Sequence, residues 1–224
     1  MNILPTQYLT PLHPPTSADD FIGPARLVAR NLEAMVKSAI AHDYAPLKIF
    51  LGGPSGTGKT GLALYLQHLL AVSKWALYEF NGTDWTIDQA RTLTSSLQLS
   101  HNDVFGLYRL IAIHEADRIP DASEVYSLTL LDNLPRRTAI ICTTNKKLGE
   151  MEARFQRRFK FTEVQCPTNA EIVELLRRWE LPEATAHMIA AGACGNVGMA
   201  MNEAEEWLQT TVESPASRDE RLAA

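Results

Sequence analysis

Gly53-Pro-Ser-Gly-Thr-Gly-Lys-Thr60 is the stretch that decides the fold, because it fits the pattern G-x-x-x-x-G-K-T at every defined position. The short apolar run Lys48-Ile-Phe-Leu51 precedes it, and residues Gly61 to Leu70 carry apolar side chains at helical spacing. Glycines let backbone amides turn inward toward phosphate oxygens, and the positive end of the following helix faces the same anion. The sequence therefore predicts a strand, a phosphate-binding loop and a helix.

The side chains of this loop have distinct expected roles. Lys59 would neutralise the outer phosphates of a nucleoside triphosphate, and Thr60 would offer its hydroxyl to magnesium. A glycine-rich turn with a chance lysine is the alternative, and the flanking strand and helix argue against it. We expect nucleotide contacts from the whole stretch and the residue after it, namely Gly53, Pro54, Ser55, Gly56, Thr57, Gly58, Lys59, Thr60 and Gly61.

Strand and helix patterns alternate along the rest of the first 166 residues. A helix is predicted to open at Pro24, and two later helices begin with the capping-box pairs Thr86 with Gln89 and Asp121 with Glu124. Short buried strands that alternate with helices predict an α/β fold, in which helices sandwich a mainly parallel sheet. The further predicted strands are Leu77 to Phe80, Leu110 to Ile113, Thr138 to Thr143 and Phe159 to Val164.

The pattern changes after Val164, where three helices follow one another without a strand. They are predicted at Thr168 to Trp179, with Glu171 completing the cap, at Pro182 to Ala191, closed by Gly192, and at Asn196 to Leu208. We interpret this part as a small all-α lid domain. The predicted organisation is an extended arm (1–20), a nucleotide-binding core (21–166), a helical lid (167–210) and a flexible tail (211–224).

Composition narrows the class of protein. The chain has 224 residues, 46% of them hydrophobic, which is enough for a buried core. Its net charge is −5, which indicates no overall affinity for nucleic acid. We found no apolar run long enough for a membrane span and no signal-peptide order, so we expect a cytoplasmic protein without a membrane partner. Cys142, Cys166 and Cys194 are too widely spaced to indicate a disulfide framework or a zinc site.

Two strand ends carry the residues that hydrolysis would need. The strand ending at Ile113 runs into His114-Glu115-Ala-Asp117, and Glu115 is the candidate general base, with a merely solvated carboxylate as the alternative. The strand ending at Thr143 is followed by Thr144-Asn145, whose amide could hold the attacking water. Asparagine after a strand is also a common turn former, so that pattern alone leaves both interpretations open.

These motifs, in this order and followed by three helices, resemble the AAA+ ATPases, and in particular their clamp-loader-like branch. The resemblance covers Asp20 to Leu208 and implies ATP and Mg²⁺ as ligands, and work as an oligomer. Gly53 to Thr60 corresponds to the Walker A motif, Leu110 to Glu115 to Walker B, and Asn145 to the first sensor. Phe21 and Ile22, in Asp20-Phe-Ile-Gly-Pro24, resemble the segment that lines the adenine pocket.

Arg154 is similar to the arginine finger by which such a protein reaches the nucleotide of a neighbouring subunit. A guanidinium fork can stabilise charge that develops on transferred phosphoryl oxygens, which supports that role. Arg157 and Arg158 are nearby alternatives for the finger. The other interpretation of this stretch is a basic surface turn that faces solvent or nucleic acid.

The sequence departs from the family pattern at two positions. His114 stands where the family has an aspartate that holds magnesium, and imidazole is a poor partner for this oxygen-preferring ion. Gly198 stands where the second-sensor arginine is expected. Asp117 could compensate for the first departure. We therefore expect ATP binding more firmly than rapid turnover.

Two classes of function follow. The first is an oligomeric ATPase that remodels DNA or a DNA-bound protein complex, and the second is a nucleotide-gated assembly protein with vestigial hydrolysis. A small-molecule kinase is a third class, disfavoured because no arginine-rich substrate lid is evident. Trp75, Trp179 and Trp207 fit helix packing. Candidate DNA contacts, each with a solvated surface residue as the alternative, are Lys146, Lys147, Arg136, Arg137 and Trp85.

Overall fold

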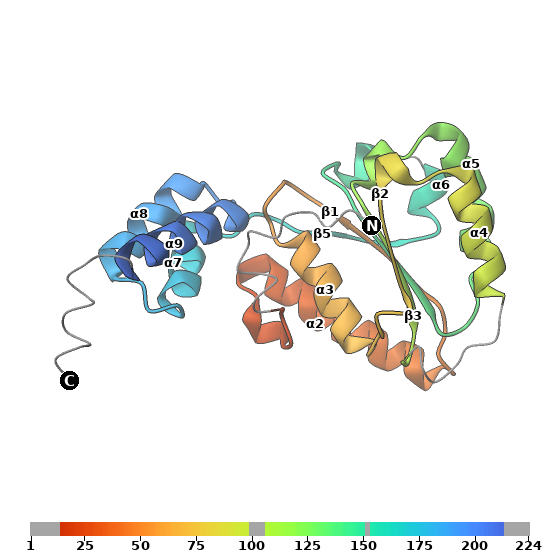
Figure 1. The fold of residues 1–224 in the computed structure, drawn as a ribbon, viewed down its shortest axis with the longest axis horizontal. Coiled ribbons are helices and arrows are strands. Elements are labelled where there is room, and N and C mark those ends of the chain that lie inside the picture. The colour runs from red at the N-terminus through yellow and green to blue at the C-terminus, as the bar shows by residue number, and fades with distance from the viewer. Residues whose placement is uncertain (1–13, 99–105, 151–152, 213–224) are drawn as a thin grey trace.

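The computed structural model describes residues 14–98, 106–150 and 153–212. Five strands form one sheet in the order β2-β3-β4-β1-β5, and all four pairings are parallel. The strands are β1 (Leu47–Gly52), β2 (Leu77–Asn81), β3 (Arg109–His114), β4 (Thr138–Thr143) and β5 (Lys160–Glu163). The predicted α/β fold with a parallel sheet is confirmed (Figure 1).

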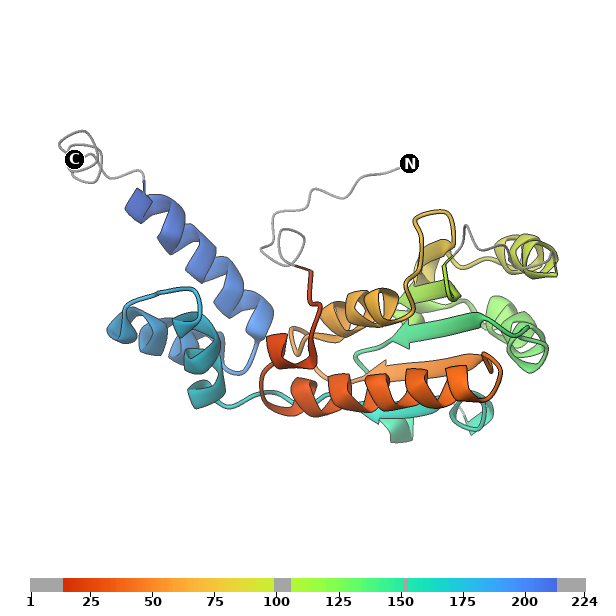
Figure 2. The same cartoon turned by 90° about the horizontal axis from the view of Figure 1, so that it is seen from below.

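Helices cover both faces of the sheet (Figures 1 and 2). Side chains of β4 alternate between the two layers: Ala139 and Ile141 belong to the cluster under α2 and α3, whereas Ile140 and Cys142 belong to the cluster under α4 and α5. This two-sided burial explains the uninterrupted apolar strand patterns. The helices of the core are α2 (Gly23–Ala41), α3 (Lys59–Leu69), α4 (Ile87–Leu97), α5 (Asp121–Asp132) and the short α6 (Ala153–Gln156).

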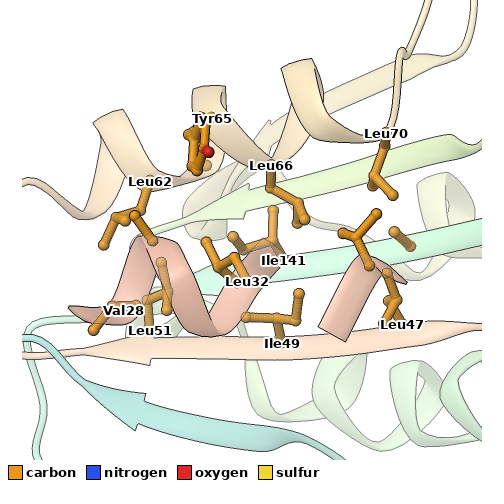
Figure 3. Close-up of a cluster of buried hydrophobic side chains, with 14 of the residues drawn as sticks. Val28, Leu32, Leu47, Ile49, Leu51, Leu62, Tyr65, Leu66, Leu70 and Ile141 are labelled. Carbon is orange, nitrogen blue, oxygen red and sulfur yellow. The ribbon is translucent and has the colours of Figure 1, made fainter. Parts of the chain in front are cut away.

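The α2–α3 layer holds the strand that leads into the phosphate-binding loop. Figure 3 shows Val28 and Leu32 of α2 and Leu62 and Leu66 of α3 packed over β1, which contributes Ile49 to the same cluster. These five side chains are each at most 5% exposed, so their burial fixes β1 firmly against α3. Single-turn helices are η1 (Ala18–Asp20), η2 (Gly82–Asp84), η4 (Ala116–Arg118) and η5 (Leu148–Glu150).

Three helices after β5 form a separate group beside the core, which we call the lid (Figure 1). They are α7 (Asn169–Arg177), α8 (Glu183–Ala193) and α9 (Val197–Val212), and they share one apolar cluster. Ile22, which precedes α2 and is 4% exposed, is buried in that cluster and so ties the core to the lid. Within the described part of the chain, no helix combines the length and apolarity needed to cross a membrane.

Local signals were right at some helix ends and wrong at others. The boxes Thr86 with Gln89 and Thr168 with Glu171 are present. Asp121 does not cap α5: Pro120 occupies the cap position with φ −61° and ψ 140°, and Asp121 is the first helical residue. Gly192 does not end α8, which continues to Ala193 and closes at Cys194 in the left-handed region.

The predicted surroundings of the tryptophans are partly wrong. Trp179 and Trp207 pack against the lid cluster as predicted, but Trp75 is 67% exposed and packs into no helix layer. Trp85, proposed as a DNA contact, is fully buried, and its indole N–H donates to the Ser127 hydroxyl at 2.6 Å. A buried, hydrogen-bonded indole is a core residue, so Trp85 is removed from the candidate DNA contacts.

Candidate functional site

The stretch from Gly53 to Thr60, hereafter the P-loop, runs from the end of β1 into the start of α3. Gly53, Gly56 and Gly58 have φ values of +137°, +76° and +93°, a region that residues with a β-carbon rarely adopt. A β-carbon on Gly53 would lie 2.2 Å from the Val164 carbonyl oxygen. The loop therefore needs glycine both for its backbone path and for its close approach to the chain after β5.

Lys59 is the charged centre of the P-loop. Its ammonium is held by the loop itself, donating to the carbonyl oxygens of Gly53 at 2.7 Å and Pro54 at 2.6 Å. Burial lowers the pKa of Lys59, and the nearby Asp117 carboxylate and Cys166 thiol act in the opposite direction. Lys59 as a whole is only 9% exposed, so a phosphate oxygen that reached its ammonium would meet a poorly hydrated cation.

Sheet order brings the predicted catalytic strand ends together. Strand β4 lies between β1 and β3, and its register places Leu51 opposite Thr143 and Ile113 opposite Cys142. The carboxyl ends of the three strands therefore meet at one edge of the sheet, where β1 becomes the P-loop. Because neighbouring strands lie about 4.8 Å apart, the end of β3 is about 10 Å from the end of β1, with only β4 between them.

Glu115 stands at the turn after β3. Its backbone is left-handed, with φ 51° and ψ 47°, and its N–H donates to the Thr143 hydroxyl at 3.4 Å. The carboxylate pairs with Arg118 at 2.9 Å and is 44% exposed. Glu115 thus lies at the edge predicted for a general base. Its ion pair with Arg118 would have to open before the carboxylate could orient a water.

His114 faces away from the P-loop, toward the outer strand β2. Its Nε2 lies 2.9 Å from Glu79 Oε1, and because an ionised carboxylate only accepts, Nε2–H donates in this pair. That hydrogen bond lowers the pKa of Glu79, outweighing the opposing effect of burial. The imidazole is therefore held by Glu79 and offers no oxygen ligand where the family pattern places an aspartate.

Asp117 lies at the site although it follows the strand end. It accepts a hydrogen bond from the buried Thr144 hydroxyl at 2.8 Å, which holds its carboxylate over the end of β4. It is also the foremost carboxylate that favours the charged form of Lys59. The left-handed turn at Glu115 returns the chain toward β4, and residue spacing alone gives no sign of that return.

The remaining predicted site residues lie on three segments. Asn145 is exposed immediately after Thr144, and Arg154 is exposed on α6. Arg158, an alternative finger, is engaged instead in a two-point ion pair with Asp132, at 2.7 and 2.8 Å. Arg157 is exposed. Arg158 is held within its own chain by that ion pair, and the assignment of the finger to Arg154 rests on the sequence motif.

Phe21 and Ile22 connect the P-loop helix to the lid. The Phe21 ring lies 5.5 Å from the Tyr65 ring of α3, and a β-carbon on Gly61 would lie 3.4 Å from it. Ile22 points into the lid cluster. This segment thus lies between α3 and the lid.

Two of the candidate DNA contacts have partners within the chain. The Arg137 guanidinium lies 3.9 Å from the centre of the Tyr44 ring, and Arg136 pairs with Asp43 at 3.0 Å. Both precede β4, at the end of the sheet opposite the P-loop. Lys146 and Lys147 are exposed and follow Asn145. Only this second pair lies at the same edge as the candidate site.

The donor set fits a magnesium-bound triphosphate. The glycine-lined loop and Lys59 suit phosphate oxygens, and the Thr60 hydroxyl with the Asp117 carboxylate suits an ion that prefers oxygen ligands. In the described ranges, no three side chains of His, Cys, Asp or Glu gather into a metal cage.

Comparisons with known proteins identify the fold. No protein-family model matches the sequence, and no curated protein matches it. Among solved structures, two variants of RuvB from Thermotoga maritima match with TM-scores of 0.70 and 0.72, at 20% identity over 86% and 89% of this chain. A third, described as a Holliday junction branch migration motor, matches with a TM-score of 0.68 at 21% identity over 86% of this chain.

The likeness has a limited extent. This chain spans 64% of the first and third of these RuvB chains and 67% of the second. Identity of about one residue in five supports the fold and singles out no branch within the class, the clamp-loader-like one included. With the sheet order, the P-loop and the three-helix lid in place, the chain has the fold found in RuvB.

Proposed function

We propose that this chain is an AAA+ protein that binds ATP with Mg²⁺ and hydrolyses it as a member of an oligomer. The observation that supports this most is the buried Lys59 ammonium inside a glycine-lined loop, with Asp117 and Glu115 at the same sheet edge. In this proposal residues 21–166 are the nucleotide-binding core and residues 167–210 the lid. Phe21 and Ile22 border the adenine.

Each polar residue of the site has a proposed task. Glu115 orients the attacking water, Asn145 positions it, and Arg154 reaches the phosphate of a neighbouring subunit. Thr60 and Asp117 hold magnesium, which when bound would neutralise charge on the phosphate oxygens. Lys59 exchanges its two carbonyl acceptors for phosphate oxygens.

DNA, or a protein complex bound to DNA, is the proposed target of the work. The support is the fold shared with RuvB, one structure of which is described as a Holliday junction branch migration motor. Lys146 and Lys147 add a small exposed cationic pair near the site. Membership of the clamp-loader-like branch remains a prediction from the sequence motifs.

Steady-state ATP hydrolysis with and without duplex DNA tests the proposal. Loss of the general base in Glu115→Gln is expected to lower turnover about a hundredfold or more while leaving ATP affinity within a few-fold. Lys59→Ala is expected to weaken ATP binding about ten- to a hundredfold, because it removes a charge-assisted contact. Glu163→Gln, on the exposed edge of β5, is the matched control. Equal background rates for wild type and Glu115→Gln would refute hydrolysis.

A second function is favoured by the His114–Glu79 pair and by Gly198. These two features leave the site without the magnesium aspartate and the second-sensor arginine of the family pattern. In this alternative ATP stabilises a ring or filament, and hydrolysis is vestigial. Sedimentation distinguishes the two: assembly that needs ATP, survives Glu115→Gln and is lost in Lys59→Ala selects the alternative.

A further inference from the structure

The first turn of α9 rests directly on the P-loop. The Val197 N–H donates to the Gly56 carbonyl oxygen at 2.8 Å. A β-carbon on Gly56 would lie 1.8 Å from Asn196 Oδ1, so the Asn196 amide lies against the Gly56 α-carbon. Figures 1 and 2 show the lid beside the core at the end where β1 leads into α3. The lid therefore contacts the loop through its backbone and one neutral side chain.

Asn196 has a second task in the same position. Its Oδ1 accepts a hydrogen bond from the Met199 N–H at 3.0 Å, as a residue capping the start of a helix does. A β-carbon on Gly198 would lie 3.3 Å from that oxygen and 4.0 Å from the Gly56 α-carbon. Gly198 is thus close to the P-loop itself.

The lid also contacts the core through the segment before α2 and through the first turns of α2. Ile22 is buried in the lid cluster, and Glu174 of α7 accepts from Arg178 at 2.6 Å and from Arg26 at 3.1 Å. Arg178 also donates to the Asp19 carbonyl oxygen at 2.7 Å. By contrast, one net hydrogen bond such as that between Val197 and Gly56 changes an equilibrium by only about two- to tenfold. The contact between α9 and the P-loop is therefore weak enough for ATP binding to change it.

We propose that Asn196 is a positioning residue through which the conformation of the P-loop sets the position of the lid. Gly56 lies in the segment whose amides must surround the phosphates, and Lys59 must leave the Gly53 and Pro54 carbonyls to reach them. Any shift of Gly56 during that exchange is passed to α9 through Asn196 and Val197. The inference rests on the proposed function, because it requires ATP to occupy the P-loop.

Hydrogen exchange of the α9 amides, measured by mass spectrometry with and without Mg-ATP, tests this coupling. In the wild type, exchange in the first turn of α9 is expected to change about two- to tenfold on ATP binding. In Asn196→Ala that response is expected to fall by at least half, while calorimetry still detects ATP binding. The ratio of kcat to KM should fall mainly through kcat, because the lid is misplaced after ATP has bound.

Two control variants separate positioning from capping. Asn196→Ser keeps a capping oxygen for α9 but removes the amide from Gly56, so it is expected to lose the response as Asn196→Ala does. Thr86→Ala removes the cap of α4, away from the P-loop, and is expected to keep the change in α9 exchange on ATP binding. A response retained in both Asn196 variants, or absent in a wild type that binds ATP, overturns the inference and leaves the proposed function standing. A wild type that binds no ATP overturns both.

Discussion

Asp117 is the site residue whose position the sequence predicted least well. The strand ending at Ile113 predicted the position of Glu115, because a strand and its last residues can be read from apolar spacing. It gave no position for Asp117, because that depends on the left-handed backbone of Glu115 and on a hydroxyl from β4. Neither is a local property of the sequence.

Replacing Asp117 by asparagine tests whether its charge matters to magnesium. Asp117→Asn keeps an oxygen that can accept from Thr144, so the geometry is retained and one negative charge is lost. We expect the gain in ATP affinity that Mg²⁺ provides to fall about tenfold, as for the loss of one charged ligand. Calorimetric titration of ATP with and without Mg²⁺ measures this gain.

Asp121→Asn is the matched control for that experiment, because Asp121 is an exposed carboxylate at the start of α5. It should leave the magnesium dependence unchanged. If Asp117→Asn also leaves it unchanged, Asp117 is a structural partner of Thr144 and does not hold the ion.

At the scale of the elements, the hydrogen bond between His114 and Glu79 joins β3 to the outer strand β2. The hydrogen bond from His114 lowers the pKa of Glu79 in the folded protein. Above the ordinary carboxyl pKa of about 4.3, Glu79 is ionised in both the folded and the unfolded protein, and its hydrogen bond then stabilises the fold in full. The contribution disappears as the pH falls through the lowered folded-state pKa. Glu79→Gln is therefore expected to lower the urea midpoint at pH 7, with a deficit that shrinks below pH 4.

The control for this measurement is Glu163→Gln, on the opposite edge strand β5. Its carboxyl is exposed, so its midpoint should follow that of the wild type at every pH. A Glu79→Gln deficit that stays constant down to pH 3 would mean that the pair contributes through packing and not through charge.

The sheet and its helices could be predicted because each signal is local. Apolar runs gave the strands, and the threonines at positions 86 and 168 gave two helix starts, since a cap needs only a partner three residues later. The capping prediction for Asp121 was wrong because Pro120, whose ring fixes φ, occupies the cap position and Asp121 is the first helical residue. The prediction for Trp85 was wrong because its partner Ser127 lies on α5, 42 residues away, and the sequence does not place the two side by side.

At the scale of the whole molecule, an arginine finger that acts between subunits predicts that two inactive variants regain activity when they are mixed. Lys59→Ala keeps Arg154 but cannot hold ATP well, and Arg154→Ala holds ATP but offers no finger. Each variant alone should be nearly inactive. An equal mixture should recover roughly a quarter of wild-type hydrolysis, because about one interface in four pairs an intact loop with an intact finger.

Steady-state hydrolysis of the mixture, after the subunits have had time to exchange, measures this recovery. Arg157→Ala replaces Arg154→Ala as the control and should be active alone. A mixture no faster than its two components would show that Arg154 does not act on a neighbouring subunit.

The two hydrogen bonds from Lys59 to carbonyl oxygens also determine how competing anions affect this protein. The ammonium has neutral oxygen partners already, so an arriving phosphate gains only the difference between a charged acceptor and an uncharged one. Inorganic phosphate or sulfate in a purification buffer offers a charged acceptor of the same kind and will consequently compete for the loop. Affinities for ATP measured in such buffers will therefore not be comparable with those measured without these anions.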